Sequence, residues 1–178
     1  MTRIVPVSEL NENAELRTEA EVIFFASAAT QGFPSTDARD AYRDLWFGRY
    51  IRAFPEMFLI AVSGDGHAAG YLAGSPVSDA PPLPGPDYYR LFPQALTEAC
   101  PAHLHVNIRA DLRGSGLGET LIAAFRRKCI KRKLPGFHAV TATGSRAARF
   151  FAKCGLAPRQ RIAWHGRNIV FLAEAIEG

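Results

Sequence analysis

The sequence predicts a mixed α/β (α+β) fold in one domain that spans residues 1–178. The length of 178 residues fits one domain, since domains typically hold roughly 100–200 residues. Segments with strand-like and helix-like patterns follow one another along the chain, and two pairs of strand-like segments are joined by short glycine turns typical of antiparallel hairpins. A hydrophobic content of 48% with 21% charged residues argues against disorder.

The first third of the chain predicts a short strand and two helices. Residues 2–7 are expected to be an edge strand, because Pro6 cannot donate a hydrogen bond to a neighbouring strand. A helical pattern of apolar residues then begins at Ser8, the expected N-cap, and is broken by Gly-Phe-Pro at 32–34. A second helix is expected over residues 35–55, where a proline ends it.

The rest of the chain alternates strands and helices. Five of the twelve prolines lie between Pro76 and Pro86, which predicts a surface loop. Gly-Asp-Gly at 64–66 predicts the turn of a hairpin. The expected strands are 57–62, 70–73, 102–108, 137–143, 160–164 and 168–173. The expected helices are 88–98, 116–133 and 145–154.

Composition limits the environment and the ligands. No apolar run approaches the roughly 18 residues needed to cross a bilayer, and no signal-peptide core follows Arg3, so we expect a cytoplasmic protein without a membrane segment. Three cysteines without a CxxC or metal-ligand spacing favour reduced thiols over disulfides or zinc. The net charge of +4 is compatible with nucleic acid, with an anionic small ligand, or with solubility alone.

The most informative segment is a glycine-rich turn between an expected strand and an expected helix. It reads Arg113-Gly114-Ser115-Gly116-Leu117-Gly118. Such glycines let the backbone N–H groups point one way, and the helix N-terminus adds about half a positive charge. The turn therefore suits a pyrophosphate, although an ordinary strand-to-helix turn can have the same pattern. It lacks the P-loop spacing, and Glu119 stands where the dinucleotide fingerprint needs glycine.

This turn resembles the acetyl-CoA signature of the GNAT N-acetyltransferase superfamily, Gln/Arg-x-x-Gly-x-Gly/Ala, through Arg113, Gly116 and Gly118. Residues 147–156 resemble the second signature of that family, Ala-x-x-Phe-Tyr-x-x-x-Gly-Phe. The resemblance implies a mostly antiparallel central sheet of six to seven strands, flanked by about four helices, with a splayed strand pair that holds the cofactor. Residues 101–107 and 136–138 are most similar to a bacterial subgroup that resembles the acetyltransferase-like domain of O-GlcNAc hydrolases.

The same resemblance implies acetyl-CoA as cosubstrate and no metal. In the family, the strand before the turn binds pantetheine through its amides, and the turn binds pyrophosphate. The cofactor contacts implied here are Val106, Asn107, Ile108, Arg113, Gly114, Ser115, Gly116, Leu117, Gly118, Glu119 and Phe151.

Alternate positions of the strand 102–108 carry polar side chains, so His103, His105 and Asn107 share one face. A neutral imidazole can accept the proton of an attacking amine. His105 is the preferred base and His103 the next. The alternative is that both are hydrogen-bonded structural residues. For His138, on the next strand, a buried hydrogen-bonded role is expected.

Two departures from the family pattern concern the cofactor. Phe151 stands where many members have the tyrosine that protonates the CoA thiolate, and Gly144 stands where many have asparagine. Water, Tyr50, Tyr71 or Ser145 are the candidates for the missing donor. The residues expected in the substrate pocket are Tyr50, Tyr71 and Asn107.

The resemblance implies an N-acetyltransferase that acts on a primary amine of a small molecule or amino sugar. Because of Phe151, a non-catalytic acetyl-CoA-binding regulatory module is the alternative. Six of the eight residues 126–133 are basic, a pattern typical of a solvated helix end. We therefore expect no nucleic-acid partner, and a monomer or homodimer.

Overall fold

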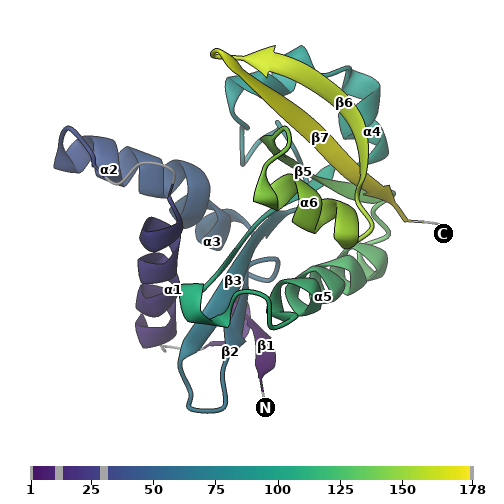
Figure 1. Ribbon diagram of the computed structural model, residues 1–178. Helices are drawn as coiled ribbons and strands as arrows, with labels where there is room; N and C mark the ends of the chain where they lie inside the picture. Colours follow the sequence, from purple (N-terminus) through teal and green to yellow (C-terminus); the bar gives the residue numbers. More distant parts are fainter. Residues whose placement is uncertain (1, 11–13, 29–31, 177–178) are drawn as a thin grey trace. The chain divides into compact units, whose positions relative to one another are not determined.

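The computed structural model describes residues 2–10, 14–28 and 32–176 (Figure 1). Its contacts group the chain into two compact units. The first unit consists of Met1–Gly74 and His105–Phe125, and the second consists of Ser75–Leu104 and Arg126–Gly178. Each unit is therefore built from two separate stretches of sequence.

The first unit contains the N-terminal helices and the glycine turn. Its elements are β1 (Arg3–Pro6), η1 (Val7–Glu9), α1 (Ala14–Ser27), α2 (Thr36–Arg43), the π-helical segment η2 (Asp44–Gly48), α3 (Arg49–Ala53), β2 (Leu59–Val62), β3 (Ala68–Ser75), the last four residues of β4 (Ala102–Ile108), η4 (Ala110–Leu112) and the first part of α5 (Leu117–Lys131). As expected, one continuous helix forms in the segment 35–55, over residues 36–53, but it is α-helical only at its two ends.

The strands of the first unit are ordered β1-β2-β3-β4. β1 pairs with β2, and β2 pairs with β3, both antiparallel, with Ile60 opposite Val5 on one side and Tyr71 on the other. Within the described residues β1 lies at the edge, as Pro6 predicted. The β2–β3 hairpin also confirms the expected glycine turn, in which Gly66 adopts a φ of 91°.

The second unit holds the first three residues of β4 and the remaining strands, in the order β4-β5-β7-β6. β5 runs parallel to β4, while β7 is antiparallel to both β5 and β6. The sheet strands thus number seven in the described chain and are mostly antiparallel, as expected. The elements are β5 (Gly136–Ala142), β6 (Ala157–Trp164), β7 (Arg167–Ala175), η3 (Asp87–Leu91), α4 (Gln94–Ala99) and α6 (Arg146–Lys153).

Each unit has its own apolar interior. In the first, α1 buries Leu16, Ala20, Ile23 and Phe24, and every residue of β2 is buried. An aromatic group fills the space beside them, with Phe47 in edge contact with both Phe58 and Tyr71. In the second unit, β7 supplies the buried run 169–173.

Two predicted helix boundaries are wrong. Residues 7–9 form a 3₁₀ turn instead of a helix capped by Ser8, and α1 is described only from Ala14, with residues 11–13 outside the described part. The helix expected over 88–98 is split into η3 and α4. Pro93 explains the split, because it lacks an N–H and forces the preceding residue, Phe92, into an extended conformation.

The proline-rich loop has little regular structure, as expected, but it is not wholly on the surface. Leu83 and Ser78 are buried, and Ser78 donates a hydrogen bond to the carbonyl of Pro101 at 2.7 Å. Across the described residues of the chain, no helix is long and apolar enough to span a membrane.

Candidate active site

The glycine turn leaves an open space in front of its backbone. Gly114 and Gly116 have φ values of 85° and 84°, a region that side chains rarely adopt. A Cβ atom at either position would meet no atom within 4 Å. The helix α5 begins at the next residue, Leu117, and the first N–H groups of a helix lack acceptors within it. A compact anion such as a pyrophosphate fits this arrangement.

Side chains of the turn hold its shape. The Ser115 hydroxyl donates to the carbonyl of Leu112 at 2.7 Å. The guanidinium of Arg113 donates to the carbonyl of Ile108 at 3.2 Å and to the Ser27 hydroxyl at 3.4 Å. The Arg113 side chain therefore ties the turn to the end of β4 and to the last residue of α1.

His105 lies on β4 against the helix formed by α2, η2 and α3. Its Nε2 is 3.0 Å from the hydroxyl of Tyr50. The rings of Trp46 and Tyr50 both meet the imidazole nearly at right angles, at centroid distances of 5.1 and 5.6 Å. Aromatic side chains from one helix thus contact the ring that the sequence indicates as the base.

Asn107, two residues further along β4, contacts the second predicted pocket tyrosine. Its Nδ2 donates to the hydroxyl of Tyr71 at 2.7 Å. The Tyr71 ring stacks on Phe58 with an interplanar angle of 8°. Burial raises the pKa of Tyr71 strongly, and the bond from Asn107 lowers it only in part. The Tyr71 phenol therefore stays neutral near pH 7.

His103 belongs to the second unit and is 2% exposed. Its Nδ1 donates to the carbonyl of Val77 at 2.7 Å. This environment supports the structural alternative for His103, because its imidazole is buried and holds the start of the proline-rich loop. Of the two histidines predicted as bases, only His105 is half-buried.

His138 has the buried, hydrogen-bonded environment that was expected. Its Nδ1 donates to the carbonyl of Cys100 at 2.6 Å, and in the neutral imidazole its Nε2 accepts from the hydroxyl of Tyr89 at 2.9 Å. The ring stacks on Phe171 at 4.1 Å. These contacts join β5, η3 and β7 within the second unit.

The segment 147–156, which resembles the second GNAT signature, includes most of α6 in the second unit. Ser145 caps this helix by accepting from the backbone N–H of Ala148 at 3.0 Å. Phe151 is 5% exposed. Gly144 has a φ of 72°, and its carbonyl accepts from Arg149 at 2.6 Å. The hydroxyl of Ser145 is thus engaged in capping, which weakens it as a candidate proton donor.

A cavity of about 690 Å³ lies beside the glycine turn in the first unit and was not expected from the sequence. Its lining includes Ser27, Ile108, Arg109, Arg113, Glu19 and His67. Glu19 accepts from Nδ1 of His67 and from the N–H of Ala68, both at 2.6 Å. Burial alone would raise the pKa of Glu19, but these hydrogen bonds outweigh it and lower the pKa. The bond to Glu19 raises the pKa of His67.

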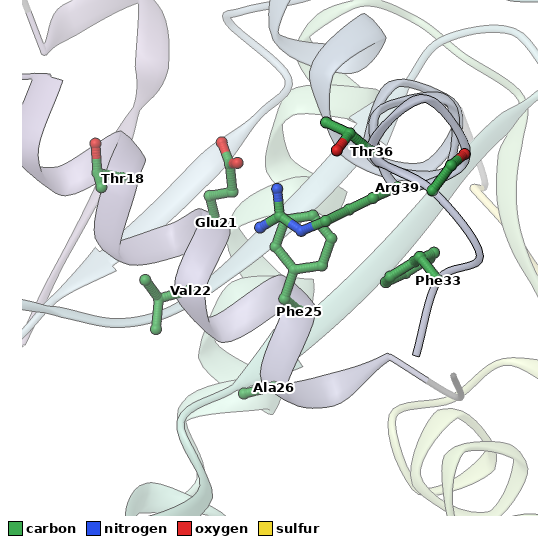
Figure 2. A pocket seen from close by; sticks show the side chains of 9 residues that line it. Thr18, Glu21, Val22, Phe25, Ala26, Phe33, Thr36 and Arg39 are labelled. Atoms are coloured by element: carbon green, nitrogen blue, oxygen red, sulfur yellow. The ribbon is translucent and has the colours of Figure 1, made fainter. Parts of the chain in front are cut away.

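A second cavity, of about 880 Å³, lies between α1 and the start of α2 (Figure 2). Its wall includes Phe25, and Figure 2 shows the Arg39 side chain over the Phe25 ring. The guanidinium carbon of Arg39 is 3.9 Å from the ring centroid. Phe33 contacts Phe25 edge-on. None of the residues predicted to bind the cofactor or the substrate lines this cavity.

Metal-ligating side chains do not cluster in the described residues. No group of three or more His, Cys, Asp or Glu side chains there could hold a metal ion. Cys100, Cys129 and Cys154 form no disulfide. Burial raises the pKa of Cys129 to about 12, so this thiol is protonated at neutral pH and is a poor ligand or nucleophile.

The chain matches the family model described as "Acetyltransferase (GNAT) family" over residues 21–156. It therefore belongs to the GNAT acetyltransferase family, whose members transfer acetyl groups. The matched range includes β4, the glycine turn and α6. No curated protein matches the chain.

Solved structures of low sequence identity share the fold. SsHAT is 19% identical, with a TM-score of 0.71 and 98% of each chain covered. Ard1 from Thermoplasma volcanium is 14% identical, with a TM-score of 0.63 and 99% of each chain covered. A chain of the NatC complex bound to Gag peptide and CoA is 12% identical, with a TM-score of 0.67 and 99% of each chain covered.

Proposed function

We propose that this protein transfers the acetyl group of acetyl-CoA to the primary amine of a small molecule or amino sugar. The observation that carries the proposal is the open glycine turn at the start of α5, with two positive-φ glycines and no atom where their side chains would be. Membership of the GNAT family supports acetyl transfer. The acceptor class rests on the sequence resemblance.

The residues of the first unit would hold the cofactor in two ways. The turn from Arg113 to Glu119 offers backbone N–H groups and the positive end of a helix to the pyrophosphate. The backbone of Val106, Asn107 and Ile108 would bind pantetheine. When bound, acetyl-CoA supplies a thioester carbonyl that an amine can attack. Phe151, in the second unit, is the remaining proposed cofactor contact.

His105 is the proposed proton acceptor. As the amine nitrogen bonds to the thioester carbon, it loses one proton to His105, and the C–S bond breaks with its electron pair on sulfur. The protonated imidazole can then return that proton to sulfur, which balances the reaction and leaves His105 neutral. A histidine suits both the acceptance and the return of the proton, because imidazole ordinarily titrates at about pH 6.5.

Some features bear on where the protein acts and with whom. Cysteines that form no disulfide fit a reducing compartment, and we include a cytoplasmic location and a monomeric or homodimeric state in the proposal. A NatC structure was solved with a peptide and CoA, so peptide N-termini belong in any acceptor panel. Phe151 favours the alternative function, a non-catalytic acetyl-CoA-binding module.

Cofactor binding is tested by calorimetry with acetyl-CoA. We expect micromolar-range affinity for the parent, and at least a tenfold loss for Gly116→Val, because its side chain fills the space meant for phosphate. Gly66→Val is the matched control, since Gly66 has a similar φ and equal free space but lies in the β2–β3 turn. Unchanged affinity in folded Gly116→Val would show that the turn does not bind the cofactor.

Catalysis is tested separately by measuring thiol release with a panel of small amines, amino sugars and short peptides. Thiol release with a small amine supports the proposal. Thiol release only with peptides would show that the acceptor is a peptide and not a small amine or amino sugar. Binding of acetyl-CoA without release by any acceptor favours the non-catalytic module. His105→Ala should lower turnover more than it lowers acetyl-CoA affinity.

A further inference from the structure

The hydrogen bond between His105 and Tyr50 has a consequence for the tautomer of the imidazole. The two residues are 55 positions apart and belong to the same unit, with 3.0 Å between Nε2 and the phenol oxygen. Trp46, four residues before Tyr50 on the same helix, also contacts the imidazole ring, with 5.1 Å between the ring centroids. Together the two aromatic side chains restrict the ring orientation of His105.

Burial decides which member of the pair faces outward. Tyr50 is 1% exposed, whereas His105 is half-buried. The phenol therefore lies on the inner side, and the imidazole is the member that an amine can approach. A reaction with the amine has to use the ring nitrogen that does not face Tyr50, which is Nδ1.

We infer that Tyr50 is a positioning residue that holds His105 in its Nε2–H tautomer. In this state Nε2–H donates to the phenol oxygen, and the lone pair of the imidazole lies on Nδ1. The amine proton moves to Nδ1 as the N–C bond forms, and the Nε2–H bond to Tyr50 is kept throughout. The hydrogen bond made by one ring nitrogen commonly fixes the role of the other.

The helix that carries Tyr50 has an unusual geometry at this point. Asp44–Gly48 is a π-helical segment between α2 and α3, and such segments often occur at functional sites. Trp46 lies inside the segment, and Tyr50 is the second residue after it, in α3. The π-helical segment therefore contributes Trp46 and leads directly into the α-helical turn that carries Tyr50, and both rings contact His105.

The inference rests on the proposed function for its meaning, but its first test needs no acceptor. We would record ¹⁵N spectra of imidazole-labelled protein about two pH units above the usual imidazole pKa, and assign His105 by its loss in His105→Ala. In the parent we expect Nδ1 to show the shift of an unprotonated nitrogen and Nε2 that of a protonated one. In Tyr50→Phe both shifts should move toward the average of the two tautomers.

Tyr42→Phe is the matched control, because Tyr42 lies on the same continuous helix and its ring stacks on Phe24 without contacting His105. It should leave the His105 signals unchanged. A parent spectrum with the proton on Nδ1 would overturn the inference, even if Tyr50→Phe does not fold. Unchanged His105 signals in folded Tyr50→Phe would also overturn it.

A kinetic test follows with any acceptor found in the amine panel. In metal sites, loss of the outer hydrogen-bond partner of a histidine typically lowers activity about 10- to 100-fold, and we use this range for the loss of the Tyr50 hydroxyl. We expect Tyr50→Phe to lower kcat by this factor while the KM for acetyl-CoA stays constant, and Tyr42→Phe to retain parental kcat. A raised KM with unchanged kcat would assign Tyr50 to ligand binding. If no acceptor reacts, the proposed function fails, whereas the spectra still decide the tautomer.

Discussion

Phe151 is the residue whose chemistry departs most from what an acetyltransferase is expected to need. Its side chain is nearly buried on α6 and has no group that can protonate a thiolate. The sequence resemblance already indicated this departure. The structure adds that Tyr71 is a buried phenol with a raised pKa and that Ser145 is engaged as a helix cap. Return of the amine proton by His105 would make a separate donor unnecessary.

Phe151→Tyr tests whether departure of the thiolate limits the rate. If a donor is lacking, the added phenol should raise kcat at least tenfold, since general acid catalysis contributes typically about 10²- to 10⁴-fold. The measurement is thiol release with a reactive acceptor, with a melting curve to check folding. Phe150→Tyr, at the neighbouring α6 position, is the control and should give no gain. An unchanged kcat in folded Phe151→Tyr would mean that protonation of sulfur is not limiting.

Single residues were predictable from the sequence where a local pattern determines them. Alternation along 102–108 placed His105 and Asn107 on the polar face, and the glycine spacing located the turn. Partners distant in sequence were not predictable. Nothing in the sequence pairs Tyr50 with His105, or Glu19 with His67, because such contacts depend on how the helices pack on the strands.

At the level of elements, an ion pair between Glu19 and His67 connects α1 to the β2–β3 turn. Glu19 of α1 accepts from His67 in the turn and from the N–H of Ala68 at the start of β3. Because the pKa of Glu19 is lowered from its ordinary value of 4.5, the ionised carboxylate stabilises this contact fully above pH 4.5. This stabilisation is lost as the pH falls through the lowered pKa. Because the pKa of His67 is raised from its ordinary value of 6.5, the protonated imidazole stabilises the contact fully below pH 6.5. This stabilisation is lost as the pH rises through the raised pKa.

We therefore expect the turn to be held most tightly between pH 4.5 and 6.5. Exchange of the Ala68 amide, corrected for intrinsic rates, should be slowest in this window and faster above it. His67→Gln should remove the dependence on the high-pH side. The Gly66 amide, which donates to the carbonyl of Ser63, provides an internal control. A flat corrected profile for Ala68 would contradict a role for the Glu19–His67 pair.

Most elements were predictable because turn chemistry marks their ends. Gly-Asp-Gly gave the first hairpin, and β4 was predicted with its observed bounds. The errors arose where one residue overrides a periodic pattern. Pro93 interrupts what reads as one helix. The π-helical segment within 35–55 was also missed, because its apolar spacing does not differ visibly from that of an α-helix.

On the scale of the whole molecule, the net charge of +4 is the sum of two opposite values. By sequence, the first unit has 8 Lys and Arg against 12 Asp and Glu, whereas the second has 13 against 5. The basic residues at the end of α5 belong to the second unit. The overall charge therefore says little about the local environment of either unit.

We propose that the two units nevertheless unfold as one domain, and the two tryptophans can test it. Trp46 lies in the first unit and Trp164 in the second. Trp164→Phe leaves a reporter for the first unit only, and Trp46→Phe leaves one for the second. In each variant we expect the urea transition followed by tryptophan fluorescence to have the same midpoint as the transition followed by far-UV circular dichroism, because each unit needs both stretches of sequence. Separate fluorescence and far-UV midpoints would contradict a single cooperative domain.

The interleaving of the two units also sets an order for folding during synthesis. The strand β3 ends at Ser75, but its neighbour in the first unit, residues 105–108 of β4, emerges later, and the unit is complete only after Phe125. At about 5–20 residues per second, the interval from residue 74 to 125 lasts roughly 3–10 s. Over that time the nascent chain carries a strand that is buried throughout in the folded protein and still has an unpaired edge, a hazard for aggregation. Slow elongation between these residues would therefore lower the soluble yield.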